Sequence, residues 1–471
     1  MAEAETLPLA QDRWLVLERT DAFGSLPPLV ALPRSEAEAI EVVRFARAHR
    51  QTIEWLGGGS KRGLGHAAPP ADIGIAFLAY EGVVEYRPRD LVVTVRAGTK
   101  MAELQALVGR EGQMIAVHVP HPDASTVGGA VSANDAGLLR FRHGAFRDHV
   151  LGVRVVSAAG EVLAFGGKVM KNVAGYDMTK LYIGALGTLG GMLEVTFRLR
   201  PLPRALRLFG ASFAPPAWPD VERFLVELLR APLEPQAVYL LSPEMAAALG
   251  QAARWTLAVV LADEPEAVEV QAKRIAAMLP DAVRGDFQRD GDEAWAFLNA
   301  LGRSLPKSPP WTAAYRPLRE AERVCDAGQR DPGDRAHEAG RPDAEGDAVS
   351  FRLGLLSTDV PEALRIIAAL TAETGRRFRA FGCFGAGVVW AVMDGAHDAG
   401  GKDAVQTALR RLRAAFPAPG RVVRLVHAPE ALRRGLDVWG LEERSIAPMR
   451  RVKRALDPDG RFRAGRWFGK A

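Results

Sequence analysis

Three glycine-rich segments follow one another in the first 190 residues, and glycine is the residue type that lets backbone amides approach an anion closely. Consecutive amides without side chains can gather around a phosphate, and a Gly-Gly pair at a helix start can present its amides to a pyrophosphate. A plain loop, or helix–strand packing that needs small residues, explains each segment equally well when it is taken alone. The segments are Gly57-Gly58-Gly59-Ser60-Lys61, Thr126-Val127-Gly128-Gly129 and Gly184-Ala185-Leu186-Gly187-Thr188-Leu189-Gly190.

The third segment is not a dinucleotide fingerprint. Its glycine spacing differs from Gly-x-Gly-x-x-Gly, and the residues after it alternate as a strand where that motif requires a helix. NAD binding is therefore not expected from it.

Histidines are the usual proton-transfer and metal-binding residues, but the nine histidines form no metal motif. His118 and His121 flank Val-Pro, and the neighbouring prolines favour an extended segment in which the two side chains diverge. A structural or exposed role is favoured for this pair. His143 and His149 lie close to the second glycine segment, where a polar contact to a ligand is plausible. No metal site is predicted, and the catalytic residues are left unknown.

The elements that must position these segments alternate between helix and strand from residue 33 to 200. Ser35 with Glu38 predicts a capping box and a helix. A strand over 53–56 leads into the first glycine segment. Strands over 153–156 and 162–165 flank a turn at Gly160, and residues 193–199 alternate apolar and polar side chains.

After Pro203 the pattern changes to strands paired with helices. Strands over 255–261 and 351–356 precede helices over 265–278 and 361–372, and a further strand and helix follow at 387–393 and 403–415. These units predict an antiparallel sheet covered on one face by helices. Residues 326–347 contain no Leu, Ile, Val, Phe or Tyr, so a mobile insertion is predicted there.

The composition is that of an ordinary globular chain, with 471 residues, 48% hydrophobic and 25% charged, and a formal net charge of +5. No nucleic-acid motif accompanies this charge. Cys325 and Cys383 form neither a disulfide framework nor an iron–sulfur motif. The N-terminus lacks the features of a signal peptide. The expectation is a cytoplasmic protein, with peripheral contact to the inner face of the cytoplasmic membrane as an option for the basic tail.

The order of the glycine segments and the stretch FGGKVMKNVAGYDMTKLYIGALGTLGGMLEVTFRLRPLP over 165–203 carry a family resemblance. Together they resemble the vanillyl-alcohol-oxidase-like flavoproteins, which have a PCMH-type FAD-binding domain. Within that family, Lys168, Lys171, Asn172, Gly175 and Asp177 stand in a context most similar to the smaller flavin subunits of bacterial glycolate oxidase complexes. The resemblance covers about residues 30–203 and is thin beyond them.

The resemblance implies FAD as the cofactor. His66 lacks the Gly-His-Ser context of a covalent linkage, so noncovalent FAD is favoured. At the end of the chain, Arg463-Ala464-Gly465-Arg466 stands where relatives carry Asn-Pro before Gly-Lys or Gly-Arg, which puts any contact from that Asn in doubt. The cofactor-binding residues that the resemblance implies are Gly57, Gly58, Gly59, Ser60, Lys61, Thr126, Gly128, Gly129, Ala133, Gly137, Asp148, Val150, Gly187 and Gly190.

The predicted organisation is an α+β protein: a two-part PCMH-type FAD-binding domain followed by an α+β cap domain with an antiparallel sheet. The predicted boundaries are 1–29 for an N-terminal extension, 30–203 for the FAD-binding domain, 204–420 for the cap with its insertion, and 421–471 for a basic segment that returns to the FAD domain.

The resemblance implies a subunit of a glycolate (D-2-hydroxyacid) dehydrogenase. Its partners would be a larger homologous flavin subunit and an iron–sulfur subunit, and its substrate a small 2-hydroxy acid. Two alternatives stay open: a self-sufficient flavin-dependent dehydrogenase of a hydroxy acid or alcohol, and a non-catalytic assembly subunit that retains the fold.

Overall fold

The structure of the chain is a computed structural model that describes residues 7–18, 20–23, 26–168, 176–318, 348–396, 398, 400–417, 419–463 and 465–468. The insertion predicted at 326–347 lies outside the described residues. So do Cys325 and positions 169–175 of the stretch that carries the family resemblance.

The first half of the FAD-binding region is a five-stranded sheet in the order β16-β1-β2-β4-β3. Strands β2, β4 and β3 run parallel, and helix α1 (Glu36–Ala48) connects β2 to β3. Half of the capping box predicted for α1 is present, because Ser35 Oγ accepts the Glu38 amide at 3.2 Å. The Glu38 carboxylate accepts the amide of Arg34 at 2.6 Å in place of the Ser35 amide that a capping box requires. The strands are β1 (Trp14–Leu17), β2 (Leu29–Ala31), β3 (Ile53–Leu56), β4 (Ile73–Ala76) and β16 (Tyr315–Pro317).

The second half is an antiparallel sheet in the order β5-β6-β10-β8-β9, and it shares one hydrophobic core with α1, α2 and α3. The predicted hairpin around Gly160 forms between β8 and β9. In β10 the alternation puts Leu193, Val195 and Phe197 into the core. The strands are β5 (Val83–Arg87), β6 (Val92–Arg96), β8 (Val150–Val156), β9 (Val162–Gly166) and β10 (Gly191–Arg198), with a short ladder of β7 (Gln113–Met114) and β11 (Arg200–Pro201) beside them.

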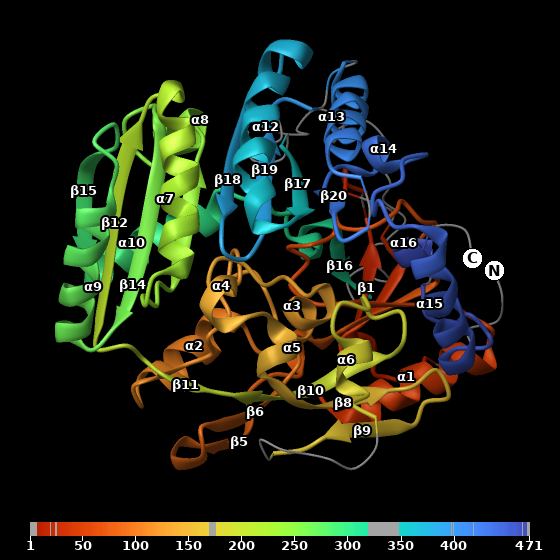
Figure 1. The fold of residues 1–471 in the computed structure, drawn as a ribbon. Helices are drawn as coiled ribbons and strands as arrows, with labels where there is room; N and C mark the ends of the chain where they lie inside the picture. Colours follow the sequence, from red (N-terminus) through yellow and green to blue (C-terminus); the bar gives the residue numbers. More distant parts are fainter. Residues whose placement is uncertain are drawn as a thin grey trace.

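Five helices complete this region, and one of them, α3, contains the second glycine segment and lies below the cap (Figure 1). They are α2 (Met101–Gly109), α3 (Val127–Ala133), α4 (Arg140–His143), α5 (Phe146–His149) and α6 (Thr179–Tyr182).

The cap is an eight-stranded antiparallel sheet in the order β15-β12-β14-β13-β18-β19-β17-β20. The strands are β12 (Ala205–Phe213), β13 (Ala237–Leu241), β14 (Trp255–Asp263), β15 (Arg284–Asp290), β17 (Val349–Gly354), β18 (Phe378–Cys383), β19 (Val388–Met393) and β20 (Val422–His427).

The prediction that helices cover one face of the cap sheet is wrong. Helices α7 (Trp218–Arg230), α9 (Pro265–Met278), α12 (Val360–Thr374) and α13 (Gly401–Ala415) share a core with one face. Helices α8 (Pro243–Ala248) and α10 (Gly291–Arg303) pack on the other face, in a core that also includes Leu138 of the FAD-binding region. The second face therefore meets both its own helices and the FAD-binding region below it (Figure 1).

Several strands cross the predicted domain boundaries. Strand β1 lies in the predicted N-terminal extension, and β16 in the predicted cap range, yet both belong to the first sheet of the FAD-binding region. Strand β20 opens the predicted C-terminal segment but is an edge strand of the cap sheet.

The rest of the C-terminal segment first packs on the cap core through Leu432, Val438 and Trp439, and then lies against the FAD-binding region. It contains α14 (Glu430–Arg433), α15 (Glu443–Leu456) and α16 (Gly465–Phe468), and Phe462 bridges to Ile53 of β3. Lys453 is buried and donates to the carbonyls of Thr188 at 2.6 Å and Phe462 at 2.9 Å, and it pairs with Asp457. None of the described helices has the length and apolar character that a membrane span requires.

Candidate functional site

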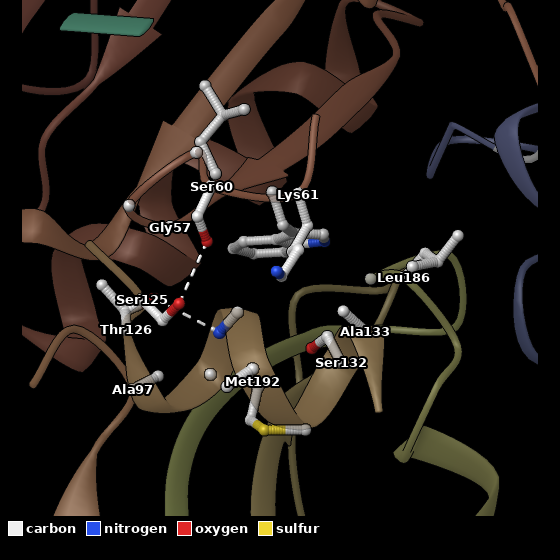
Figure 2. Close-up of a pocket in the computed structure, with 18 of the residues that line it drawn as sticks. Gly57, Ser60, Lys61, Ala97, Ser125, Thr126, Ser132, Ala133, Leu186 and Met192 are labelled. Carbon is white, nitrogen blue, oxygen red and sulfur yellow. Dashed lines mark hydrogen bonds between the residues drawn. The ribbon is translucent and has the colours of Figure 1, made fainter. Parts of the chain in front are cut away.

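The first two glycine segments meet across a cavity of about 800 Å³, counting its open mouth. The first segment is the loop after β3, and the second is the N-terminus of α3. They face each other so closely that Ser60 Oγ and Ser125 Oγ share a hydrogen bond of 3.0 Å (Figure 2). Thr126 caps α3 by accepting the Gly129 amide at 3.3 Å. Leu186 and Gly187 of the third segment complete the wall.

Glycine is required at this junction because side chains would separate the two segments. A Cβ at Gly57 would lie 2.4 Å from Thr126 Oγ1, and one at Gly58 would lie 1.8 Å from the Ala124 carbonyl oxygen. A Cβ at Gly128 would lie 2.7 Å from Ala97 Cβ, which follows β6, so α3 is also packed closely on its other side. Gly59 has φ +81° and lies against the ring of Trp311. The close approach of backbone to backbone is therefore built into the sequence of both segments.

The cavity wall contains hydrogen-bond donors without acceptors. Within the described residues, no group accepts from the amides of residues 58–61. Trp55 Nε1 is buried and also has no acceptor there. Lys61 adds a positive charge, held by Asp135 at 2.8 Å. Amides without acceptors beside a lysine fit a diphosphate, so these residues fit FAD.

Part of the predicted set lines this cavity: Gly57, Gly58, Gly59, Ser60, Lys61, Thr126, Gly128, Gly129, Ala133 and Gly187. Four predicted residues lie outside it and have evident structural contacts. The Gly137 amide donates to the His118 carbonyl at 2.7 Å, and Asp148 accepts the Ala145 amide at 2.8 Å. Val150 is buried in β8, and Gly190 lies where a Cβ would be 3.0 Å from the Val156 carbonyl. Their contact with a cofactor stays a prediction.

Sequence reasoning missed three residues that shape the cavity. Trp55 lies in the strand that leads into the first glycine segment, so its position near the end of a strand before a binding loop was a usable signal. Trp311 lies 254 residues away in sequence from Gly57 and donates to its carbonyl at 2.8 Å. Arg466 lines the cavity from the far end of the chain. No local pattern indicates the last two.

Arg466 holds the loop at the first glycine segment from the far end of the chain. It donates to the carbonyls of Leu64 at 2.9 Å and Lys61 at 2.7 Å, and it pairs with Glu54. Burial lowers the pKa of Arg466 to about 10, against the opposing effect of Glu54. The guanidinium of Arg466 is therefore occupied in holding the loop around residues 61–64, although the residue also lines the cavity.

The histidines near the site are held away from the cavity and in their neutral form. Burial lowers the pKa of His143 to about 4 and lowers that of His66. His121 is buried and its ring hydrogen-bonds the Leu305 carbonyl at 2.5 Å, which favours the structural role predicted for it. His427 is 3% exposed, and burial with nearby Lys61 lowers its pKa to about 3.

No cluster of histidine, cysteine and carboxylate side chains suited to a metal occurs among the described residues.

Comparison with known proteins agrees with this geometry. Residues 27–166 match the FAD binding domain family. The chain is 38% identical over 167 residues to glycolate oxidase subunit GlcE of Escherichia coli (strain K12), covering 35% of this chain and 47% of that protein. It is 30% identical over 199 residues to glycolate oxidase subunit GlcD of Bacillus subtilis (strain 168), 42% of each. It is 31% identical over 189 residues to D-2-hydroxyglutarate dehydrogenase of Stutzerimonas stutzeri (strain A1501), 40% of each. These matches span less than half the length of the curated relatives.

Solved structures extend the likeness to the whole fold. p-Cresol methylhydroxylase superposes with a TM-score of 0.68 at 14% identity, over 98% of this chain and 96% of that chain. 4-Ethylphenol oxidase from Gulosibacter chungangensis superposes with a TM-score of 0.66 at 18% identity, over 96% and 91%. The predicted fold class, a PCMH-type FAD-binding domain followed by a cap with an antiparallel sheet, is confirmed.

Proposed function

We propose that this chain, a relative of the PCMH-type FAD-binding oxidoreductases, is the FAD-binding component of a D-2-hydroxyacid dehydrogenase built from several different subunits. Glycolate is the substrate that the sequence resemblance indicates, and its oxidation to glyoxylate releases two electrons and two protons. The electrons would pass to an iron–sulfur partner subunit, beside a larger homologous flavin subunit.

The observation that carries this proposal is the junction of the two glycine segments. It brings four consecutive amides without acceptors and Lys61 to the wall of one cavity. The relatives named above add the substrate class: two are glycolate oxidase subunits, and one is a 2-hydroxyacid dehydrogenase.

FAD, when bound, supplies the two-electron acceptor for alcohol oxidation. The amides of residues 58–61 would hold its diphosphate, and Lys61 would balance part of the charge. The first amides of α3 already donate within the protein, so α3 would form the opposite wall of this site. The cavity lining contains no histidine or cysteine among the described residues, which supports noncovalent binding. No side chain is assigned as the base that removes the hydroxyl proton.

The experiment compares the isolated chain with the chain co-purified with its partner subunits. The isolated chain should contain FAD but reduce an artificial electron acceptor with glycolate only slowly, and the complex should turn over fully. Full turnover by the lone chain would exclude the subunit role and support a self-sufficient dehydrogenase.

A second arm tests the assembly role. A variant that cannot bind FAD is built into the complex in place of the native chain. Loss of glycolate oxidation supports a working flavin in this subunit. Retained activity supports a non-catalytic assembly subunit.

A further inference from the structure

Two arginines stand side by side on the face of the cap sheet that looks toward the FAD-binding region. Arg352 of β17 and Arg424 of β20 are directly paired across the two strands. In an antiparallel pair, opposite Cβ atoms lie about 5 Å apart, and like charges in such positions destabilise the sheet. The next strand continues the row with Trp390, which lies opposite Arg352 and receives its guanidinium at 5.7 Å from the ring centroid.

A third arginine approaches from the FAD-binding region. Arg140 belongs to α4, whose neighbour Phe141 packs against Gly385 of the cap. The adjoining Leu138 carbonyl accepts the hydroxyl of Tyr239 in β13. Arg140 is near enough to act electrostatically on both cap arginines, and its Nη1 is buried without a hydrogen-bond partner in the described part of the chain.

These three cations have no matching acid among the described residues. Burial, with Arg140 and Arg424 nearby, lowers the pKa of Arg352 to about 9, and Asp135 opposes this effect. Asp135, however, is already paired with Lys61. Asp148, the carboxylate that acts on Arg140, is exposed to solvent. The three arginines are half-buried, where like charges without a counterion repel one another, and an anion bound between them would relieve that repulsion.

The cluster is coupled electrostatically to the wall of the cofactor cavity, which none of the three arginines lines. Asp135 connects them, because it acts on Arg352 on one side and holds Lys61 of the cavity wall on the other. Each of the three arginines keeps some accessible surface, as a group that binds a small solute must.

We propose that Arg140, Arg352 and Arg424 form the anion-binding part of the substrate site, and that they select 2-hydroxy acids carrying a second carboxylate. This inference rests on the flavin-dependent oxidation of a 2-hydroxy acid under the proposed function, and it makes a 2-hydroxy dicarboxylate, not glycolate, the preferred substrate. The adjacent guanidinium groups of Arg352 and Arg424 hold one carboxylate between them, and Arg140 meets the other from across the domain boundary. A monocarboxylate such as glycolate leaves one side of the cluster without its anion.

Binding of two acids to the purified, FAD-loaded chain tests this inference. The probes are tartronate, a 2-hydroxy dicarboxylate, and glycolate, and the readouts are calorimetric dissociation constants and the shift in melting temperature. Tartronate should bind at least about tenfold more tightly than glycolate. Arg352→Met and Arg424→Met should each weaken tartronate binding by at least about tenfold and reduce its preference over glycolate.

The matched control is Arg379→Met, which removes an arginine of the same sheet that already has Asp394 as its partner at 2.7 Å. It should leave both dissociation constants unchanged. Should Arg352→Met fail to fold, Arg424→Met on the edge strand β20 provides the same test. Equal affinity for tartronate and glycolate, or unchanged tartronate binding in the arginine variants, would overturn the inference.

Failure of the inference and failure of the proposed function can be told apart by adding each acid without oxygen and following flavin bleaching. Flavin reduction with no effect of the arginine variants on binding would leave the oxidation standing and remove the arginine site. Tight, arginine-dependent tartronate binding without flavin reduction by any 2-hydroxy acid, in the lone chain and in the complex with its partner subunits, would support the anion site and refute the oxidation.

Discussion

Gly128→Ala is the substitution that most sharply tests whether α3 holds the cofactor. The new Cβ would lie 2.7 Å from Ala97 Cβ, and ordinary contacts begin near 3.4 Å, so the helix must recede by about 0.7 Å. The Gly128 amide donates to the Ala97 carbonyl at 2.9 Å, and that bond would lengthen to roughly 3.6 Å, beyond hydrogen-bonding range. We expect the free energy of unfolding to fall by about 1–3 kcal/mol.

The same displacement shifts α3 relative to the loop of residues 58–61, whose amides have no acceptor, and so disturbs the proposed diphosphate site. Loss of one hydrogen bond to a charged group costs about 1.5–3 kcal/mol, so the dissociation constant of FAD should rise roughly 10- to 100-fold. Apoprotein titrated with FAD, followed by quenching of flavin fluorescence, measures this change. Gly109→Ala is the control, because nothing lies within 4 Å of its new Cβ and FAD affinity should not change. Unchanged FAD affinity in a destabilised Gly128→Ala protein would refute a role for the α3 N-terminus.

Three further predictions concern the surroundings of the site. Lys453→Met should lower the free energy of unfolding by about 3–5 kcal/mol in urea titrations, because it leaves the buried carboxylate of Asp457 without its cation. Lys273→Met removes one side of the exposed pair with Glu269 and should change the free energy of unfolding by less than about 1 kcal/mol. Equal effects of the two substitutions would contradict a stabilising role for the Lys453–Asp457 pair. Trp311→Phe removes the donor to the Gly57 carbonyl and should raise the dissociation constant of FAD several-fold in the same fluorescence titration, whereas an unchanged constant would show that this ring does not position the loop. The pKa of His427 is lowered to about 3 in the folded chain, against about 6.5 in the unfolded chain, so between these pH values only the unfolded chain binds the proton. The free energy of unfolding should therefore fall by up to about 1.4 kcal/mol per pH unit as the pH decreases through this range. In urea titrations at pH 7 and pH 5, His427→Leu should show a smaller decrease than the native chain, and an identical decrease would contradict this prediction.

Local pattern was enough to predict most elements and the heart of the candidate site. The helix predicted over 265–278 matches α9 at both ends, because Pro265 at its start and the apolar periodicity are local signals. The glycines of the first two segments could be identified because a backbone that must approach another backbone leaves few alternatives to glycine. That the two segments meet at one cavity was implied only by the family resemblance, which assigned both of them to FAD.

Contacts between distant residues could not be predicted from local pattern. Strand β16 joins the first sheet from the far side of the cap, and its three residues carry too little periodicity to reveal a partner. Helices α8 and α10 look like any amphipathic helix, and which face of a sheet they cover depends on the connections. Arg352 and Arg424 become neighbours only through the pairing of β17 with β20, which no spacing in the sequence encodes.

The presence of FAD in the purified chain tests the account most directly. The protein is purified, its visible spectrum is recorded, and the flavin released by denaturation is counted per chain. The purified protein should be yellow and contain one FAD per chain. Acid precipitation of the protein should release this FAD into the supernatant. A colourless chain that takes up no FAD from an excess would contradict it.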